Sequence, residues 1–367
     1  MSKQTPFKDT DEINQYEVCF TGMKIKYLQY ASMIRARKFL SPNDKVNVCI
    51  NIETLLHSLV SIRDIDDIVI GDKDFTTICV SGIINLAAHY KRFFRKYGLD
   101  TKVFLYYSNL NSKSFKNTKY EKHYREYYHN KFLSGKYYVI GRKLVEEIIP
   151  MVSKIMEFIP DTYFIKTDNI DSSLVPMVIS RLYPDRKNFI VTGDNYDTQY
   201  MNYPGFFTLL VRRASTQVLF ISDLDKIIPL IFRDNMAVVN NVDVFYNKMF
   251  YSMCLASTGD HRRNIKSVKG IGPKTVSNKI KKAIKDGELT SDCGSVDICC
   301  SIFREESDNM SINCRCINLD SQFADMTDAD SFEVKNQIID RYDRNSLEEL
   351  NRTVYQFYPL MINELIN

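Results

Sequence analysis

Short, continuous runs of apolar residues alternate with longer amphipathic runs along the middle of the chain. The apolar runs predict strands at 46–51, 102–107, 162–166 and 188–192, with two further strands at 206–211 and 217–221. Between them, apolar residues recur at helical spacing and predict a short helix through Leu55, Leu56 and Leu59 and longer ones at 75–97, 142–158 and 172–182. Apolar strands that alternate with helices are typical of a parallel sheet covered on both faces. We therefore predict an α/β fold built on a parallel sheet.

The two ends of the chain have less regular patterns. Residues 23–40 have helical periodicity with basic residues on the polar side, and 346–366 carries the apolar stripe of a helix that packs on the body of the protein. The pattern is weakest in 286–345, which holds five cysteines. Because these cysteines lack the paired C-x₂-C spacing of common zinc sites, a zinc site is the less favoured interpretation of this region.

One stretch, 255–285, combines glycines, a proline and lysines around a predicted turn. Two glycines permit a tight turn whose backbone can approach a ligand, and Pro273 suits the first position of the following helix. The amides at the start of that helix form a site for an anion. This predicts a helix-hairpin-helix that grips a nucleic-acid backbone, whereas the alternative is an ordinary helix connection with a solvated lysine face. The predicted phosphate-binding residues are Lys269, Gly270, Gly272, Lys274 and Lys279.

Polar residues follow the predicted strands, and ligands of parallel sheets collect at these carboxyl ends. The first two strands end at Asn51 and Ser108, while acidic residues follow the next two and another precedes the hairpin. Carboxylates gathered at one edge of a sheet would suit Mg²⁺ or Mn²⁺, although aspartate is also a common helix cap. The candidate metal ligands are Asp168, Asp171, Asp194, Asp197 and Asp260.

A basic and aromatic insertion, 108–136, follows the second predicted strand. Its cations recur at every third residue and tyrosines lie between them, which is the arrangement expected where lysines track phosphates and aromatic rings stack on exposed bases. A solvated charged helix whose tyrosines pack inward is an equally open interpretation. The candidate contacts to a single strand are Lys113, Lys116, Lys119, Lys122, Tyr124 and Arg125.

Length, charge and composition indicate how many domains the chain can form and in which compartment we expect it. With 367 residues and a net charge of +4, the chain can form one large domain or two smaller ones, and its basic character is local. No run is long and apolar enough to span a bilayer, and the N-terminus lacks the apolar region of a signal peptide, so we expect an intracellular protein without membrane contact and with reduced cysteines. Abundant Asn, Ile, Lys and Tyr without Trp suggest an AT-rich genome such as that of a virus, which would place the protein in the host cytoplasm.

Together these features resemble the 5′-nuclease family, which comprises flap endonucleases and the 5′–3′ exonucleases of bacteriophages. The most specific piece is Gly259-Asp260 followed by 264–272, NIKSVKGIG; 192–198 is similar to the family's S/T-x-D-x-D strand end, and 168–171 to its acidic helix start. The resemblance covers 46–285 and implies a PIN-like sheet, a helical arch at 108–136 and a helix-hairpin-helix lobe. It also implies phosphodiester hydrolysis with two divalent ions, Mg²⁺ or Mn²⁺, and a monovalent ion in the hairpin turn.

The sequence departs from the family pattern where the resemblance implies acidic residues. Asn51 stands at the end of the first strand, with Glu53 two residues on, and Ser108 stands at the end of the second. Asn195 replaces the first acid of the D-x-D pair, and Arg263 replaces the second acid of the hairpin approach. These changes remove charges that would offset metal dehydration, and an arginine beside the surviving acids can pair with them in place of a metal.

These observations give an expected organisation and function. We expect an N-terminal helical extension (1–45), a PIN-like domain (46–239), a hairpin region (240–285) and a C-terminal helical extension (286–367). The expected function is binding of DNA at flaps or single-strand/duplex junctions, with nuclease chemistry weakened or lost. Two alternatives remain open: an active metal-dependent 5′–3′ exonuclease or flap endonuclease, and a structural subunit that assembles with viral or replication proteins.

Overall fold

A computed structural model describes the chain in stretches separated by gaps. The described residues are 40–52, 73–108, 144–157, 159–168, 170–194, 196–212, 215–219, 252–259, 265–288, 302–303, 308–324 and 326–339, with the backbone of 18–20 and 23–25. The predicted helices through Leu55 and at 346–366, the insertion beyond Ser108, and the positions Asn195, Asp260 and Arg263 lie outside them.

The body of the protein is the predicted sheet. Its strands lie in the order β5-β4-β3-β6-β7-β8, and all pair in parallel except β8, which is antiparallel to β7. The strands are β3 (Lys45–Asn51), β4 (Asp100–Ser108), β5 (Thr162–Thr167), β6 (Arg186–Thr192), β7 (Phe206–Arg212) and β8 (Ser215–Leu219). The prediction of an α/β fold with a parallel sheet is confirmed.

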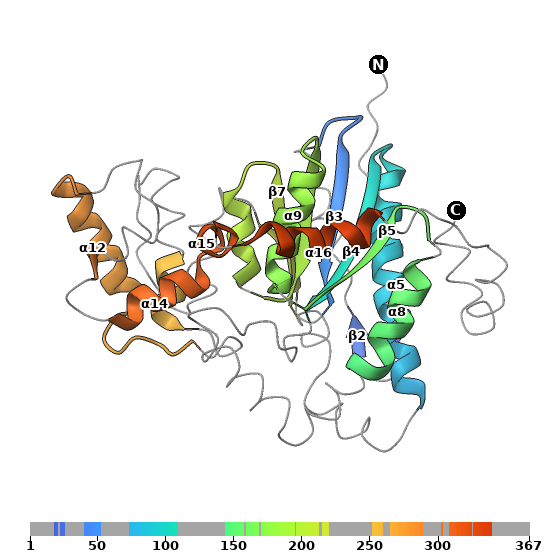
Figure 1. Cartoon of the computed structure of the whole chain (residues 1–367), viewed down its shortest axis with the longest axis horizontal. Helices are drawn as coiled ribbons and strands as arrows, with labels where there is room; N and C mark the ends of the chain where they lie inside the picture. The colour runs from blue at the N-terminus through green and yellow to red at the C-terminus, as the bar shows by residue number, and fades with distance from the viewer. Residues whose placement is uncertain are drawn as a thin grey trace.

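Helices cover both faces of this sheet. On one face, α5 (Lys73–Lys96) and α8 (Ile149–Met156), which follows the π-helical turn η2 (Leu144–Ile148), pack on alternate residues of β3 such as Val48 and Ile50. On the other face, the turn η3 (Ser172–Leu174), α9 (Val175–Leu182) and the turn η4 (Tyr196–Asn202) lie over Cys49 and Phe104. Figure 1 shows α5 and α8 side by side along the sheet. Because neighbouring residues of a strand point to opposite faces, each of the strands β3 to β7 has residues packed in both cores.

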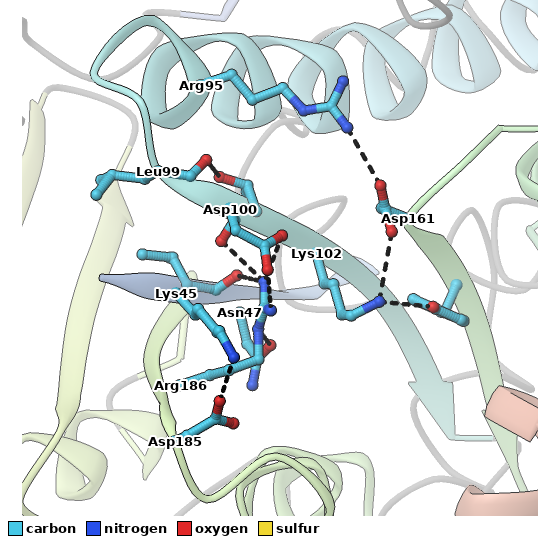
Figure 2. Close-up of polar contacts among 12 residues, drawn as sticks. Lys45, Asn47, Arg95, Leu99, Asp100, Lys102, Asp161, Asp185 and Arg186 are labelled. Carbon is cyan, nitrogen blue, oxygen red and sulfur yellow. Dashed lines mark hydrogen bonds and ion pairs between the residues drawn. The ribbon is translucent and has the colours of Figure 1, made fainter. Parts of the chain in front are cut away.

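The amino-terminal edge of the sheet is held by one buried arginine. Arg186, at the start of β6, donates from Nε to Asn47 Oδ1 at 2.8 Å, and its two terminal nitrogens lie 2.6 and 3.2 Å from the carboxylate of Asp100 (Figure 2). It also donates to the backbone carbonyls of Val46 and Asp100 at 3.0 and 2.8 Å. The Arg186 side chain thus joins β3, β4 and β6 and fixes the register of the strands that reach the opposite edge.

A second group of helices extends from the sheet. Residues 252–258 are helical, α12 (Pro273–Lys285) follows the hairpin, and α14 (Asp308–Ile317), α15 (Leu319–Ala324) and α16 (Asp328–Ile339) follow in turn. Figure 1 shows α12 and α14 at one end of the molecule, with α15 and α16 leading back to the sheet. There, Gln337 of α16 donates to the Lys166 carbonyl and accepts from its amide, both at 2.8 Å. This side chain therefore satisfies the backbone amide and carbonyl of Lys166 on the edge strand β5.

Three expectations from the sequence are corrected. Residues 23–25 form β2 (Met23–Ile25), which pairs with β1 (Val18–Phe20), because MKIK alternates apolar and polar residues with the period of a strand. The region 286–345 is not weakly organised between 308 and 339, where its three helices bury residues such as Met310 and Val334. Cys314 is disulfide-bonded, so the expectation of reduced cysteines is wrong for this residue. None of the helices in the described stretches is both long and apolar enough to cross a membrane.

Candidate nucleic-acid interface and strand-end site

Four adjacent parallel strands end in neutral polar residues on the same face of the sheet. Asn51, Ser108, Thr167 and Thr192 are all at most 3% exposed. Ser108 and Thr167 are partners in the β4–β5 register, and Asn51 and Thr192 directly follow the paired residues Ile50 and Val191 of β3 and β6. Both Ser108 and Thr167 donate to the Ile170 carbonyl, at 3.2 and 2.9 Å. The carboxyl edge therefore carries hydroxyl and amide groups, and two of them, Asn51 and Ser108, stand at the places where the resemblance implies acids.

One buried carboxylate, Asp197, lies over this row. Its Oδ2 accepts a 2.6 Å hydrogen bond from Thr192 Oγ1 and lies 3.3 Å from Asn51 Nδ2. Burial raises the pKa of Tyr106 and Tyr200 well above the ordinary value, and the negative charge of Asp197 adds to the shift at both phenols. These tyrosines therefore stay protonated, and Asp197 Oδ2 accepts its hydrogen bonds from the neutral groups of Thr192 and Asn51.

The other candidate ligands in this part of the chain act as caps or lie at its margin. Asp171 Oδ1 accepts from the amide and the hydroxyl of Ser173, at 2.9 and 2.6 Å, and so caps η3. Asp194 Oδ1 accepts from the Tyr196 amide at 3.0 Å at the entry to η4. Asp168 is partly exposed, 3.8 Å from the Lys166 ammonium. The capping alternative considered for these aspartates thus describes Asp171 and Asp194.

The described donor set does not fit a pair of divalent ions. Among the described residues, no three side chains of the His, Cys, Asp and Glu types are grouped so that they could hold a metal ion. A two-metal site needs several carboxylate oxygens free to point at the ions, whereas Asp171 and Asp194 direct an oxygen at the backbone. Asp260 and the substituted positions Asn195 and Arg263 lie outside the described residues.

Sequence reasoning gave no role in the site to two members of the strand-end row, Thr167 and Thr192, although the resemblance places Thr192 at the start of the S/T-x-D-x-D strand end. A search for ligands passes over threonine, because its hydroxyl is a weak metal donor and because threonine is common in strands. The signal that could have found them is position, since Thr192 is the last residue of the predicted strand 188–192 and Thr167 directly follows the predicted strand 162–166. Ser108 and Asn51, which were singled out, lie in the same row.

The hairpin has the predicted form and depends on a close crossing of the chain. Gly259 has φ +73°, and a Cβ there would lie 2.4 Å from the Ile265 carbonyl oxygen, so only glycine fits. Beyond this crossing, the Val268 amide donates to the Ser257 carbonyl at 2.9 Å and the Ile271 amide to the Val268 carbonyl at 3.2 Å. Gly270, with φ +81°, occupies the turn between them. The hairpin is therefore fixed on the helical stretch 252–258.

The helix α12 separates apolar and basic residues to opposite sides. Val276, Ile280 and Ala283 are buried, together with Val268 and Ile271 of the hairpin. The lysines that remain exposed on the hairpin and on α12 are Lys266, Lys269, Lys274, Lys281, Lys282 and Lys285.

Lys279 differs from the other predicted phosphate ligands. Its ammonium lies 3.4 Å from the Ile302 carbonyl oxygen and 5.2 Å from the centre of the Phe303 ring. This lysine is partly buried and ties α12 to 302–303, so the structure gives it a packing contact that sequence reasoning did not foresee.

Comparison with solved structures finds the same fold in bacteriophage T5. The T5 5′-exonuclease with bound zinc has a TM-score of 0.51 and 13% identity, covering 80% of this chain and 98% of that chain. A pseudo-enzyme–product complex of the T5 flap endonuclease with DNA and metal ions has a TM-score of 0.50 and 14% identity over the same shares. No family model and no curated protein matches the chain. At this identity the likeness is one of fold.

Proposed function

The chain has the 5′-nuclease fold, and from this premise we propose that it binds DNA at flaps or single-strand/duplex junctions, with its nuclease chemistry weakened or lost. One contrast within the molecule carries the proposal. The hairpin and α12 keep a fixed turn with exposed lysines beside it, whereas β3 and β4 end in the neutral residues Asn51 and Ser108, where the resemblance implies acids.

The hairpin is the proposed contact to duplex DNA. Lys269 and Lys274 are exposed beside the turn, and the amides at the start of α12 favour an anion. Because such contacts reach phosphates and not base edges, binding should be independent of sequence. Lys281, Lys282 and Lys285 extend the same basic surface along α12. Lys279 is expected to contribute through packing, because its ammonium faces Ile302 and Phe303.

The single strand is proposed to contact the basic insertion at 108–136. Lysines tracking phosphates and tyrosines stacking on bases would together bind an unpaired strand without sequence preference. This part of the proposal rests on the sequence pattern and on the emergence of the insertion from Ser108, at the carboxyl edge of β4.

Weakened chemistry is proposed because the strand-end row offers few ligands. Mg²⁺ or Mn²⁺ would activate water and stabilise the leaving oxygen in a two-metal nuclease. The alternative of an active enzyme is favoured by one observation, namely that Asp171, Asp194 and Asp197 all lie beyond the carboxyl ends of β5 and β6. In an active site these side chains, together with Asp260, would have to present carboxylate oxygens to the ions.

A cleavage assay separates the two candidates. A labelled 5′-flap substrate is incubated with Mg²⁺ and then with Mn²⁺, and binding to the same substrate is measured in parallel. We expect binding without cleavage. Metal-dependent cleavage that disappears in Asp260→Ala would show instead that the site is active.

A charge reversal tests the hairpin contact. Lys274→Glu should weaken flap binding and lower the slope of log affinity against log salt concentration, because one phosphate contact fewer releases fewer counterions. The matched control is Lys154→Glu, the same change at an exposed position on α8, which lies over the opposite face of the sheet. If both variants weakened flap binding equally, the effect would come from net charge alone, and the hairpin contact would be refuted.

A further inference from the structure

Asn313 of α14 lies against the hairpin crossing. It is 8% exposed, and its Nδ2 donates to two backbone carbonyls, those of Ala256 and Lys266, both at 2.9 Å. Ala256 belongs to the helical stretch 252–258, and Lys266 belongs to the chain that returns towards the hairpin turn. One amide from the C-terminal extension therefore joins the two segments that frame the proposed DNA contact.

The contact completes the end of the first hairpin helix. The last carbonyls of a helix have no partners within it and must find them elsewhere. Here the Leu255 carbonyl accepts from the Gly259 amide, and the Ser257 carbonyl accepts from the Val268 amide. The carbonyl between them, on Ala256, accepts from Asn313. Asn313 thus supplies a donor from α14 to the end of this helix.

The chemistry at this position is specific to asparagine. Both partners are carbonyl oxygens, so the amide must direct its nitrogen at them, and the NH₂ group has two hydrogens to donate. Aspartate has the same shape but would set a carboxylate oxygen against two carbonyl oxygens. Alanine would leave both carbonyls without this donor in a buried place, which costs more than an exposed hydrogen bond would.

From this geometry we propose that Asn313 is a positioning residue for DNA binding, holding the hairpin in the conformation that meets the phosphate backbone. The inference rests on the proposed function of the hairpin and extends it to the C-terminal extension. A pre-ordered hairpin binds without a further loss of conformational entropy. Loss of the Asn313 contacts should therefore weaken binding, while the same lysines still reach the same phosphates once the complex forms.

This mechanism makes affinity and salt dependence respond differently. A variant that removes a phosphate contact lowers both the affinity and the salt slope. A variant that only loosens the hairpin should lower the affinity about tenfold, the equivalent of about one buried hydrogen bond left unmade, and should keep the wild-type slope. Substitution of a contact residue thus changes the salt slope, whereas substitution of a positioning residue leaves it unchanged.

The experiment measures 5′-flap affinity across a salt series for Asn313→Asp and Asn313→Ala in the full chain, with melting temperatures alongside. Thr162→Val is the matched control for lost stability. Thr162 is also buried, and its Oγ1 lies 2.6 Å from the Ile159 carbonyl and 3.1 Å from the Met156 carbonyl, at the amino end of β5. Lys274→Glu is the control for a lost phosphate contact. Hydrogen exchange of the amides of 265–271 reports on the hairpin directly.

We expect both Asn313 variants to bind about tenfold more weakly with an unchanged slope, and to exchange faster at 265–271, while Thr162→Val melts earlier but binds as wild type. Wild-type affinity in the Asn313 variants, with Lys274→Glu still weakened, would overturn the positioning role and leave the proposed function intact. An unaffected Lys274→Glu would overturn the hairpin contact of the proposed function, on which this inference rests. If Asn313→Asp does not fold, the affinity and the exchange rates of Asn313→Ala test the positioning role instead. An equal loss of affinity in the Asn313 variants and in Thr162→Val would contradict the proposal.

Discussion

Arg186 joins three strands at the amino-terminal edge of the sheet. Its substitution measures how much one buried side chain contributes to the free energy of unfolding. Arg186→Lys keeps the charge but cannot reach Asn47, the Val46 carbonyl and Asp100 together, because an ammonium lacks the planar fork of a guanidinium. We expect a loss of about 3 kcal/mol in the free energy of unfolding, measured by denaturant titration. The control is Lys45→Met, which breaks the neighbouring exposed pair with Asp185 and should leave the midpoint unchanged. A comparable loss of stability in both variants would contradict the role of Arg186 in joining the three strands.

The ion pair between Arg186 and Asp100 predicts that the stability of the protein depends on pH. The hydrogen bonds from Arg186 hold the pKa of Asp100 below its ordinary value. Asp100 therefore contributes its full stability above the ordinary carboxyl pKa of about 4, and this contribution is lost as the pH falls through the lower pKa of the folded state. The stability difference between wild type and Asp100→Asn should shrink as the pH falls below about 4. A difference that stays constant across this range would refute the linkage.

Single residues also show where sequence reasoning stops. Asn51 and Ser108 could be placed at strand ends because the apolar runs before them stop there. The sequence did not predict that Asn51 lies beside Asp197, since the two are far apart in the chain and meet only when β3 and β6 pair. Arg186 likewise follows a turn and carries no local signal of burial. Contacts of this kind depend on strand order, which periodicity alone does not specify.

At the scale of one helix, α12 separates two kinds of lysine. Lys281 is exposed, whereas the Lys279 ammonium faces the Ile302 carbonyl and the Phe303 ring. Lys281→Met should weaken duplex binding and lower the salt slope by about one without changing the melting temperature. Lys279→Met should instead lower the stability by about 1 kcal/mol and keep the slope. Salt titrations and thermal melts of the two variants check this, and a lowered slope in Lys279→Met would restore it to the phosphate contacts.

The elements that were predicted and those that were missed differ in length and in pattern. The sequence predicts a helix at 75–97 because apolar residues recur there at helical spacing over many turns. The observed helix α5 spans Lys73–Lys96. The helices α15 and α16 were missed because α15 is only 6 residues long and because α16 buries few apolar residues, among them Val334 and Ile338. Much of the docking of α16 is polar, through Gln337 and Glu333 to the backbone of β5 and its end. Hydrophobic periodicity gives no signal for contacts of this type.

Across the whole molecule, the hairpin and the sheet share one core. The cluster that contains Val276 and Ile280 of α12 also contains Cys314 of α14 and Phe104 and Ile190 of the sheet. The sequence predicted the hairpin as a separate region, because its glycines and lysines form a compact motif. The connection was not predictable, because α14, α15 and α16, whose positions sequence reasoning did not identify, contribute residues to this cluster. This continuity makes the orientation of the hairpin depend on the packing of the C-terminal extension.

A shared core predicts that the hairpin and the sheet unfold together. The chain contains no tryptophan, so Phe303→Trp reports on the hairpin end and Tyr183→Trp on the sheet end of the same cluster, where Tyr183 packs near Phe104. Both probes should give coincident denaturation curves, as expected for one cooperative unit. Ile280→Ala, which empties a site only 1% exposed, should move both curves by the same amount, about 3 kcal/mol. If the hairpin probe unfolded first and Ile280→Ala moved that curve alone, the hairpin would be an independent unit, and its orientation would not depend on the C-terminal extension.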